Sequence, residues 1–348
     1  MSYTNGLDKP TDYFNAVLWE GNNTAGRQIT GVGFEPDLVW LKNRTSSANH
    51  GLHTQITGVD GAEYLRTNGT NAITTSANHV TSFDSDGFTI NNGLMLNDTS
   101  NNYVAWNWKA GGSASSNTDG SITSSVSVNQ TAGISIGTFT GTASVGTVGH
   151  GLNAVPSMII NRTITAAKDW MTYHHKNTSA PQTDYLALNS TNATADFEDV
   201  WNDTAPTSSV FTIGNSSQNN TGSGTSIFYA FAEKKGFSKF GSYVGNGSTS
   251  GTYVHLGFSP SFVMLKRTNT TGSWTMYDNK RHTYNPNGEY LLANNSSGGI
   301  DFNNVDFLSN GFKLRDASFN NGSGDTIIYM CFAESPFTTS TGIPTTAR

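Results

Sequence analysis

The chain has 348 residues, of which 13% are charged and 11% are aromatic, and its formal net charge at pH 7 is −6. This acidic balance, without a basic run, argues against nucleic-acid binding, which draws much of its affinity from lysine and arginine on phosphates. No apolar stretch approaches the 18 residues that a membrane-spanning helix needs, and no pattern of a cleaved signal peptide opens the chain.

The chain carries three similar stretches after a short arm at residues 1–12. Each stretch has a Gly/Thr-rich strand, a loop, an apolar run led by proline and a closing strand rich in aromatic residues. The prolines are Pro36, Pro156 and Pro260, which lie 120 and 104 residues apart. Solenoid repeats are much shorter, and a unit of about a hundred residues can hold its own core. We therefore expect three modules arranged like beads.

The module boundaries follow from composition. We expect modules at residues 13–110, 126–235 and 236–337. The Gly/Ser/Thr-rich stretch 111–125 is predicted to be a linker or long surface loop, and residues 338–348 a C-terminal tail. Because the second junction is short, modules two and three should be held more rigidly than modules one and two.

The strand patterns indicate an all-β chain. Segments are short, rich in β-branched and aromatic residues, and bounded by Gly, Asn, Asp or Pro, with no sustained helical periodicity. In each copy two strands are apolar on both faces, for example residues 38–41 and 104–106. Such strands are typical of the middle of a two-layer packing. We predict a β-sandwich of the jelly-roll kind for each module.

Aromatic residues recur at matching places, which favours a role in the core over sugar stacking. One set comprises Trp19, Phe139 and Tyr243. A second set, on one face of the closing strand, comprises Trp106, Phe231 and Phe332. Small residues occupy the other face: Ala105, Ala230 and Cys331. The one cysteine is thus expected to be a small buried residue and not a reactive thiol.

Two tryptophans without matching copies, Trp108 and Trp201, are the better candidates for surface rings that stack on sugars. A structural role is favoured for each of them as well.

Residues 84–88, Asp-Ser-Asp-Gly-Phe, resemble the start of a calcium-binding loop. The third copy has Leu-Ser-Asn-Gly-Phe at residues 308–312, so leucine replaces Asp84. What persists is Asp-Gly or Asn-Gly between strands, which is typical of a tight hairpin turn. The turn is the favoured interpretation.

Histidines cluster at His50 with His53 and at His174 with His175, while His282 lies in a comparable region of the third copy. A zinc site would need further His or Cys ligands at fixed spacing. We expect loop or sheet-surface histidines and no metal site.

Catalytic signatures are lacking. The sequence has no nucleophile elbow in an α/β pattern and no phosphate-binding glycine loop before a helix. Glu233 and Glu334 recur, with Trp108 as their counterpart in the first copy, and are interpreted as solvated edge residues. We therefore expect no catalytic residue and no cofactor, while a ligand-binding site stays unassigned.

Several longer motifs resemble a family of virion proteins common in marine tailed bacteriophages. They are VTSFDSDGF at 80–88, YVAWNWKAGG at 103–112, GHGL at 149–152, TAPTSSVF at 204–211, SKFGSY at 238–243 and IYMCFAESPF at 328–337. In that family such modules occur alone or beside lectin-like domains, in proteins labelled tail, fibre or structural. The resemblance implies a non-enzymatic structural protein, assembled in the host cytoplasm and displayed on the virion as a tail or fibre component or a head decoration.

The implied partners are other virion proteins, with host-surface glycans as a further candidate. Multiple copies per particle or a homo-oligomer are expected, although three modules in one chain can also supply a pseudo-threefold unit as a monomer. Two alternatives stay open: a stand-alone carbohydrate-binding protein and, less favoured, a polysaccharide depolymerase, which would need two facing carboxylates.

Overall fold

The computed structural model describes residues 6–57, 63–93 and 95–345. Within these ranges it comprises 27 strands, one α-helix of four residues and one short 3₁₀ helix. The all-β prediction is confirmed. Neither helix in the described ranges has the length and apolar character needed to cross a membrane.

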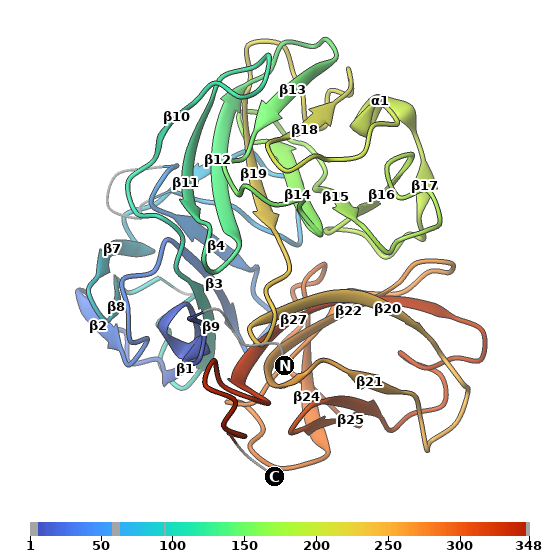
Figure 1. The fold of residues 1–348 in the computed structure, drawn as a ribbon. Helices are drawn as coiled ribbons and strands as arrows, with labels where there is room; N and C mark the ends of the chain where they lie inside the picture. The colour runs from blue at the N-terminus through green and yellow to red at the C-terminus, as the bar shows by residue number, and fades with distance from the viewer. Residues whose placement is uncertain (1–5, 58–62, 94, 346–348) are drawn as a thin grey trace.

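The three copies form three lobes around a common centre, coloured blue, green to yellow, and orange to red along the chain (Figure 1). Each lobe has four inner antiparallel strands in the same spatial order, which form a sheet of their own in the first copy and belong to an eight-stranded sheet in the second and third. In the first copy the order is β1 (Phe14–Glu20), β9 (Asn102–Trp108), β3 (Leu38–Asn43), β4 (Gly51–Thr54). In the second it is β12 (Ile134–Thr140), β19 (Thr225–Phe231), β14 (Met158–Thr163), β15 (Met171–His174). In the third it is β20 (Ser238–Val244), β27 (Thr326–Pro336), β22 (Phe258–Arg267), β23 (Thr275–Asp278).

A smaller outer layer covers each inner sheet. In the first copy it consists of β2 (Arg27–Thr30), β8 (Gly87–Ile90) and β7 (Val80–Asp84). In the second it is the pair β13 (Gly146–Gly149) and β18 (Val210–Ile213). In the third it is β25 (Ile300–Leu308), β26 (Gly311–Leu314) and β21 (Tyr253–His255), joined to the inner strands through β24 (Asn287–Leu292). A separate apolar core lies between the layers of each copy, as a sandwich requires.

Shorter elements complete the lobes. They are β5 (Glu63–Tyr64), β6 (Thr74–Thr75), β16 (Asp184–Ala187), β17 (Ala195–Asp196) and the helix α1 (Glu198–Trp201). The stretch expected as a linker contains β10 (Ser115–Asn117), which pairs with β11 (Ser124–Asn129) at the edge of the second sheet. This segment is thus part of the second lobe.

A fourth apolar core lies where the lobes meet and takes side chains from all three copies. Successive residues of a strand point to opposite faces. In β3, Leu38 and Trp40 point to this central core, while Val39 and Leu41 point to the core of their own lobe. The prediction that both faces of this strand avoid water is confirmed, and the neighbouring copies supply the second cover. The shared core departs from the expected row of separate beads.

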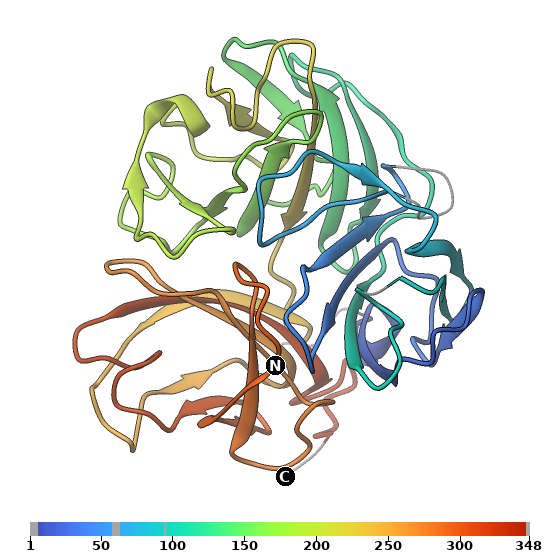
Figure 2. The same ribbon diagram turned by 180° about the vertical axis from the view of Figure 1, so that it is seen from behind.

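Aromatic rings tie the copies together at this centre. The ring of Phe332 in the third copy lies 5.0 Å from Phe14 and 5.7 Å from Trp108 of the first copy, and 6.0 Å from Phe231 of the second. Full burial of one such side chain stabilises a fold by about 1.5–3 kcal/mol. The view from behind shows the same three lobes arranged around the centre (Figure 2).

The two ends of the chain also meet. Leu7 is buried in the central core, and the 3₁₀ helix Pro10–Asp12 packs against β27 of the third copy. The carboxylate of Asp8 accepts hydrogen bonds from the backbone N–H and the hydroxyl of Ser340. The described part of the expected arm therefore joins the first copy to the third.

Candidate functional site at the interfaces between the modules

The register of the closing strands corrects one set of matches. Trp108 pairs with Phe14 of β1 and with Leu38 of β3. Phe231 and Phe332 pair with the residues at the same two positions in the sheets of the second and third copies. The counterpart of these two phenylalanines is therefore Trp108, and the match to Trp106, two residues earlier, is wrong.

The same two-residue displacement affects the other matches on this strand. Asn107, and not Ala105, stands in the place of Ala230 and Cys331. By the same count, the first-copy counterpart of the recurring glutamates Glu233 and Glu334 is Ala110, and not Trp108.

The structural role favoured for the two unmatched tryptophans is confirmed, because both side chains are buried. Trp108 is 1% exposed and lies in the central core, while Trp201 is 3% exposed and lies in the core of the second lobe. Two core predictions are confirmed. Trp19, Phe139 and Tyr243 are buried, and Cys331 is a buried thiol whose pKa is raised well above its usual value by desolvation.

The Asp-Gly segment after β7 is the predicted turn, which is confirmed. Residues 85–86 form a turn between β7 and β8, and Gly87 has a φ of +146°. The carboxylate of Asp86 accepts the backbone N–H of Gly33 at 2.6 Å, and that of Asp84 accepts the hydroxyl of Thr89 at 2.7 Å. Both carboxylates thus serve the local fold.

The histidines lie deeper than predicted. His50, His53 and His174 are buried, so the loop or sheet-surface interpretation is wrong for these three, while His175 and His282 are half-buried. Burial lowers the pKa of both His50 and His174 to about 3, although each ring donates a hydrogen bond from Nε2 to a backbone carbonyl. These rings are therefore neutral in the folded chain.

In every copy, the residue immediately before the fourth inner strand has a ring N–H that donates a hydrogen bond to the neighbouring copy. The ring nitrogens donate to backbone carbonyls as follows: His50 Nε2 to Leu292 at 2.9 Å, Trp170 Nε1 to Arg66 at 3.0 Å, and Trp274 Nε1 to Ala187 at 3.0 Å. In the first copy the tautomer is set by Trp40, whose Nε1–H donates to Nδ1 of His50 at 2.9 Å. The first copy thus bonds to the third, the second to the first and the third to the second, which closes a ring.

In each copy, a buried basic side chain also donates hydrogen bonds to the same neighbouring copy. Lys42, Arg162 and Lys266 occupy matching places on β3, β14 and β22 and have no exposed surface. Their nitrogens donate to carbonyls of the neighbouring copy: Lys42 Nζ to Ser296 at 3.0 Å, Arg162 Nη2 to Thr70 at 2.8 Å, and Lys266 Nζ to Thr191 at 3.1 Å. Burial lowers the pKa of both lysines to about 7.

Across the described residues, no carboxylate lies within ion-pair distance of these three cations. Backbone carbonyl groups therefore take the place of a counter-ion, and each cation fixes the path of a loop in the next copy.

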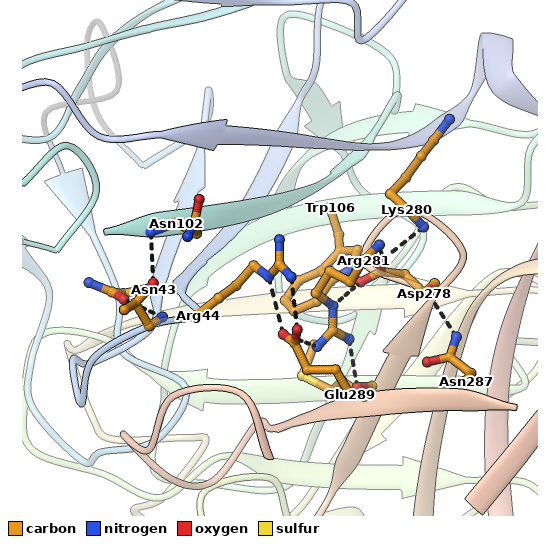
Figure 3. Close-up of polar contacts among 11 residues, drawn as sticks. Asn43, Arg44, Asn102, Trp106, Asp278, Lys280, Arg281, Asn287 and Glu289 are labelled. Carbon is orange, nitrogen blue, oxygen red and sulfur yellow. Dashed lines mark hydrogen bonds and ion pairs between the residues drawn. The ribbon is translucent and has the colours of Figure 1, made fainter. Parts of the chain in front are cut away.

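The contact between the first and third copies adds a charged network (Figure 3). The guanidinium of Arg44 binds Glu289 through two hydrogen bonds of 2.8 and 3.1 Å. Arg281 donates to Asp278 at 2.5 Å and lies 3.4 Å from Glu289, and Trp106 Nε1 donates to Asp278 at 3.0 Å. Burial alone would raise the pKa of Glu289, but the hydrogen bonds and charges of Arg44 and Arg281 lower it below its usual value.

A family model described as a domain of unknown function (DUF7483) matches residues 9–336. The chain belongs to this family. The matched region takes in all three copies of the module. No curated protein and no solved structure gave a match.

The network of this DUF7483 chain joins the first copy to the third. Its two carboxylates, Asp278 and Glu289, are matched by the guanidinium groups of Arg44 and Arg281. His282, Glu289 and Asp301 bring ligand atoms within 4.8 Å of one another, a spacing that a metal ion can bridge. Both oxygens of Glu289 already accept hydrogen bonds from Arg44, so this group is committed to the interface.

The interface residues were missed by sequence reasoning, although a signal exists. Lys42, Arg162 and Lys266 each lie six residues after the matching proline, inside a strand that is otherwise apolar. A basic residue kept at one place in three copies of a buried strand indicates a buried, partnered cation.

Proposed function

We propose that this chain is a non-enzymatic structural protein of a tailed bacteriophage particle, exposed on the virion surface as a tail or fibre component or a head decoration. The supporting observation is that the side chains repeated in the three copies serve contacts between them. Lys42, Arg162 and Lys266 bind neighbouring backbone, and Trp108, Phe231 and Phe332 fill the shared core. Repetition that serves cohesion favours a structural role.

The chemistry of the fold suits a protein that works outside a cell. The chain has one cysteine, so it forms no internal disulfide. Its stability rests on three lobe cores, a central core and polar contacts buried between the lobes. A closed set of contacts of this kind resists local opening, because each lobe is held by both of its neighbours.

The arrangement also favours the monomeric form of the expected threefold unit. Three inner sheets in one chain surround a shared core, as three subunits do in a trimer. The partners we propose are other virion proteins, to which the chain would bind as one preassembled body.

The test is to locate the chain on purified particles. The chain would be tagged within the tail at residues 338–348 and detected on intact virions by labelling and electron microscopy. The proposal expects a constant number of copies at one outer position. Absence of the chain from purified virions would reject it.

A further inference from the structure

The second copy departs from the other two at one strand. In the first copy β7 pairs with β8, and in the third β25 pairs with β26. In the second, β18 pairs with β13 but with no third strand of the outer layer in the described residues, and α1 packs against β18 instead.

The helix α1 is held firmly in this place. Val200 and Trp201 insert into the core of the second lobe. The carbonyl of Val200 accepts the backbone N–H of Gly214, and that of Asp199 accepts the N–H of Ser216. These hydrogen bonds hold the loop after β18 against the helix. The packing of the second copy therefore fixes α1 at the place that a strand occupies in the other two copies.

An open polar cleft of about 670 Å³ lies beside this helix. Strands β15 to β17, helix α1 and the loop at residues 215–218 form its walls. The volume is in the range of small-molecule sites, about 300–1,000 Å³.

The lining offers rings and free hydrogen-bonding groups together. Phe197 is 47% exposed and Tyr185 is half-buried, and both line the cleft. Among the described residues, the Tyr185 hydroxyl and the Asn192 side-chain amide have no hydrogen-bond partner. Gln218 Oε1 accepts the backbone N–H of Asp169 at 2.8 Å, which leaves its Nε2 free to donate into the cleft.

The charges of the cleft restrict the ligand. Asp169 and Asp199 line it, and no lysine, arginine or histidine of the described chain does so. A lysine bonded to the lining, Lys168, donates its Nζ to the hydroxyl of Ser217 at 3.0 Å. An anionic ligand would meet like charge. A neutral ligand with many hydroxyl groups can donate to the carboxylates, accept from the amides and place its C–H face on a ring.

We propose that this cleft binds a neutral saccharide, of one or two sugar units given its volume. The inference goes beyond the structural role and does not depend on where the chain lies on a particle. The cleft is confined to one copy, so one saccharide site per chain is expected.

The test uses the full chain on an array of neutral and acidic glycans, followed by titration calorimetry with the best neutral glycan. Phe197→Ala and Tyr185→Phe should each weaken binding by about tenfold, the scale of one ring contact or one hydrogen bond. Phe302→Ala, which removes another exposed ring in the third copy, is the matched control and should leave binding unchanged. Thermal unfolding of each variant checks that the fold is retained.

Four outcomes would overturn the inference: no neutral glycan bound at millimolar concentration, a preference for acidic glycans, binding that the two cleft variants leave unchanged, or release of shortened sugars, which would make the cleft a hydrolytic site. Saccharide binding by a chain that is absent from virions would keep this inference and remove the structural role, so the two proposals can fail separately.

Discussion

At the scale of single residues, buried neutral histidines make the stability of this fold depend on pH. Nδ1 of His50 accepts the indole N–H of Trp40, so a proton on Nδ1 would break that bond and place an unpaired charge in the interior. Burial lowers the pKa of His50, His79 and His174 to about 3, against about 6.5 in the unfolded chain. The unfolded chain therefore takes up protons first as the pH falls.

The first prediction is that the free energy of unfolding falls as the pH drops from 6.5 to 5. Each such histidine contributes up to about 1.4 kcal/mol per pH unit in this window. Burial raises the pKa of Asp37 to about 6, which acts in the opposite direction, but three histidines outweigh one aspartate. Thermal unfolding across this pH range measures the slope.

The variant that tests the cause is His50→Gln, which should flatten the slope. His255→Gln, on an exposed ring, is the control and should leave it unchanged. A slope that is equal in all three proteins would show that His50 does not contribute.

The second prediction concerns the buried ion pair of the charged network. Asp278→Asn removes the charge that faces Arg281, and both side chains are fully buried. Loss of one partner of a buried pair costs about 3–5 kcal/mol. Denaturant unfolding gives the value.

Asp12→Asn is the control, because Asp12 pairs with Lys9 on the surface. Exposed pairs contribute about 0–1 kcal/mol. Equal effects of the two substitutions would contradict the role assigned to Asp278.

At the scale of strands, β3, β14 and β22 each combine an apolar run with one buried cation. The cation lies near the end of the strand and binds the carbonyl groups of a loop in the neighbouring copy. Because the second copy uses arginine where the others use lysine, this place accepts either side chain as long as it donates.

The third prediction follows from this interchange. Lys266→Arg should retain most of the stability, whereas Lys266→Met should lose about 1–3 kcal/mol or more, because the carbonyl groups of Thr191, Asn192 and Gly272 lose their donor. Denaturant unfolding of the two variants measures the difference. If the methionine variant were as stable as the arginine variant, the donated hydrogen bonds would not hold the loop.

The strands themselves were predictable from sequence, and their partners were not. The alternation in β3 and the aligned rings at Trp19, Phe139 and Tyr243 identify strands and core positions from local pattern alone. The two-residue error at Trp108 arose because Trp106 and Trp108 lie on the same face of the closing strand, which meets the central core, so the sequence offers two registers that keep a tryptophan on that face. Pairing with β1 and β3 decides between them, and pairing is non-local.

The cleft could not be predicted from the sequence either, because it too depends on non-local contacts. Its walls come from β15 to β17, α1 and the loop at 215–218, and the helix has four residues, too few for a visible period. The missing strand of the second copy becomes evident only when the three lobes are compared in space.

At the scale of the whole molecule, the three lobes share one core and are joined by ring N–H groups, cations and the two chain ends. Phe332 packs on rings from both other copies, and Leu7 enters the same core from the N-terminal side. A lobe that unfolds alone would expose the inner faces of its neighbours. The chain is therefore expected to unfold as one cooperative body, and not as three independent modules.

Differential scanning calorimetry of the full chain tests this claim most directly. We expect a single transition in which the calorimetric enthalpy equals the van't Hoff enthalpy, because all three lobes unfold together. Two or three resolved transitions, or a calorimetric enthalpy about two to three times the van't Hoff value, would show independent modules and contradict it.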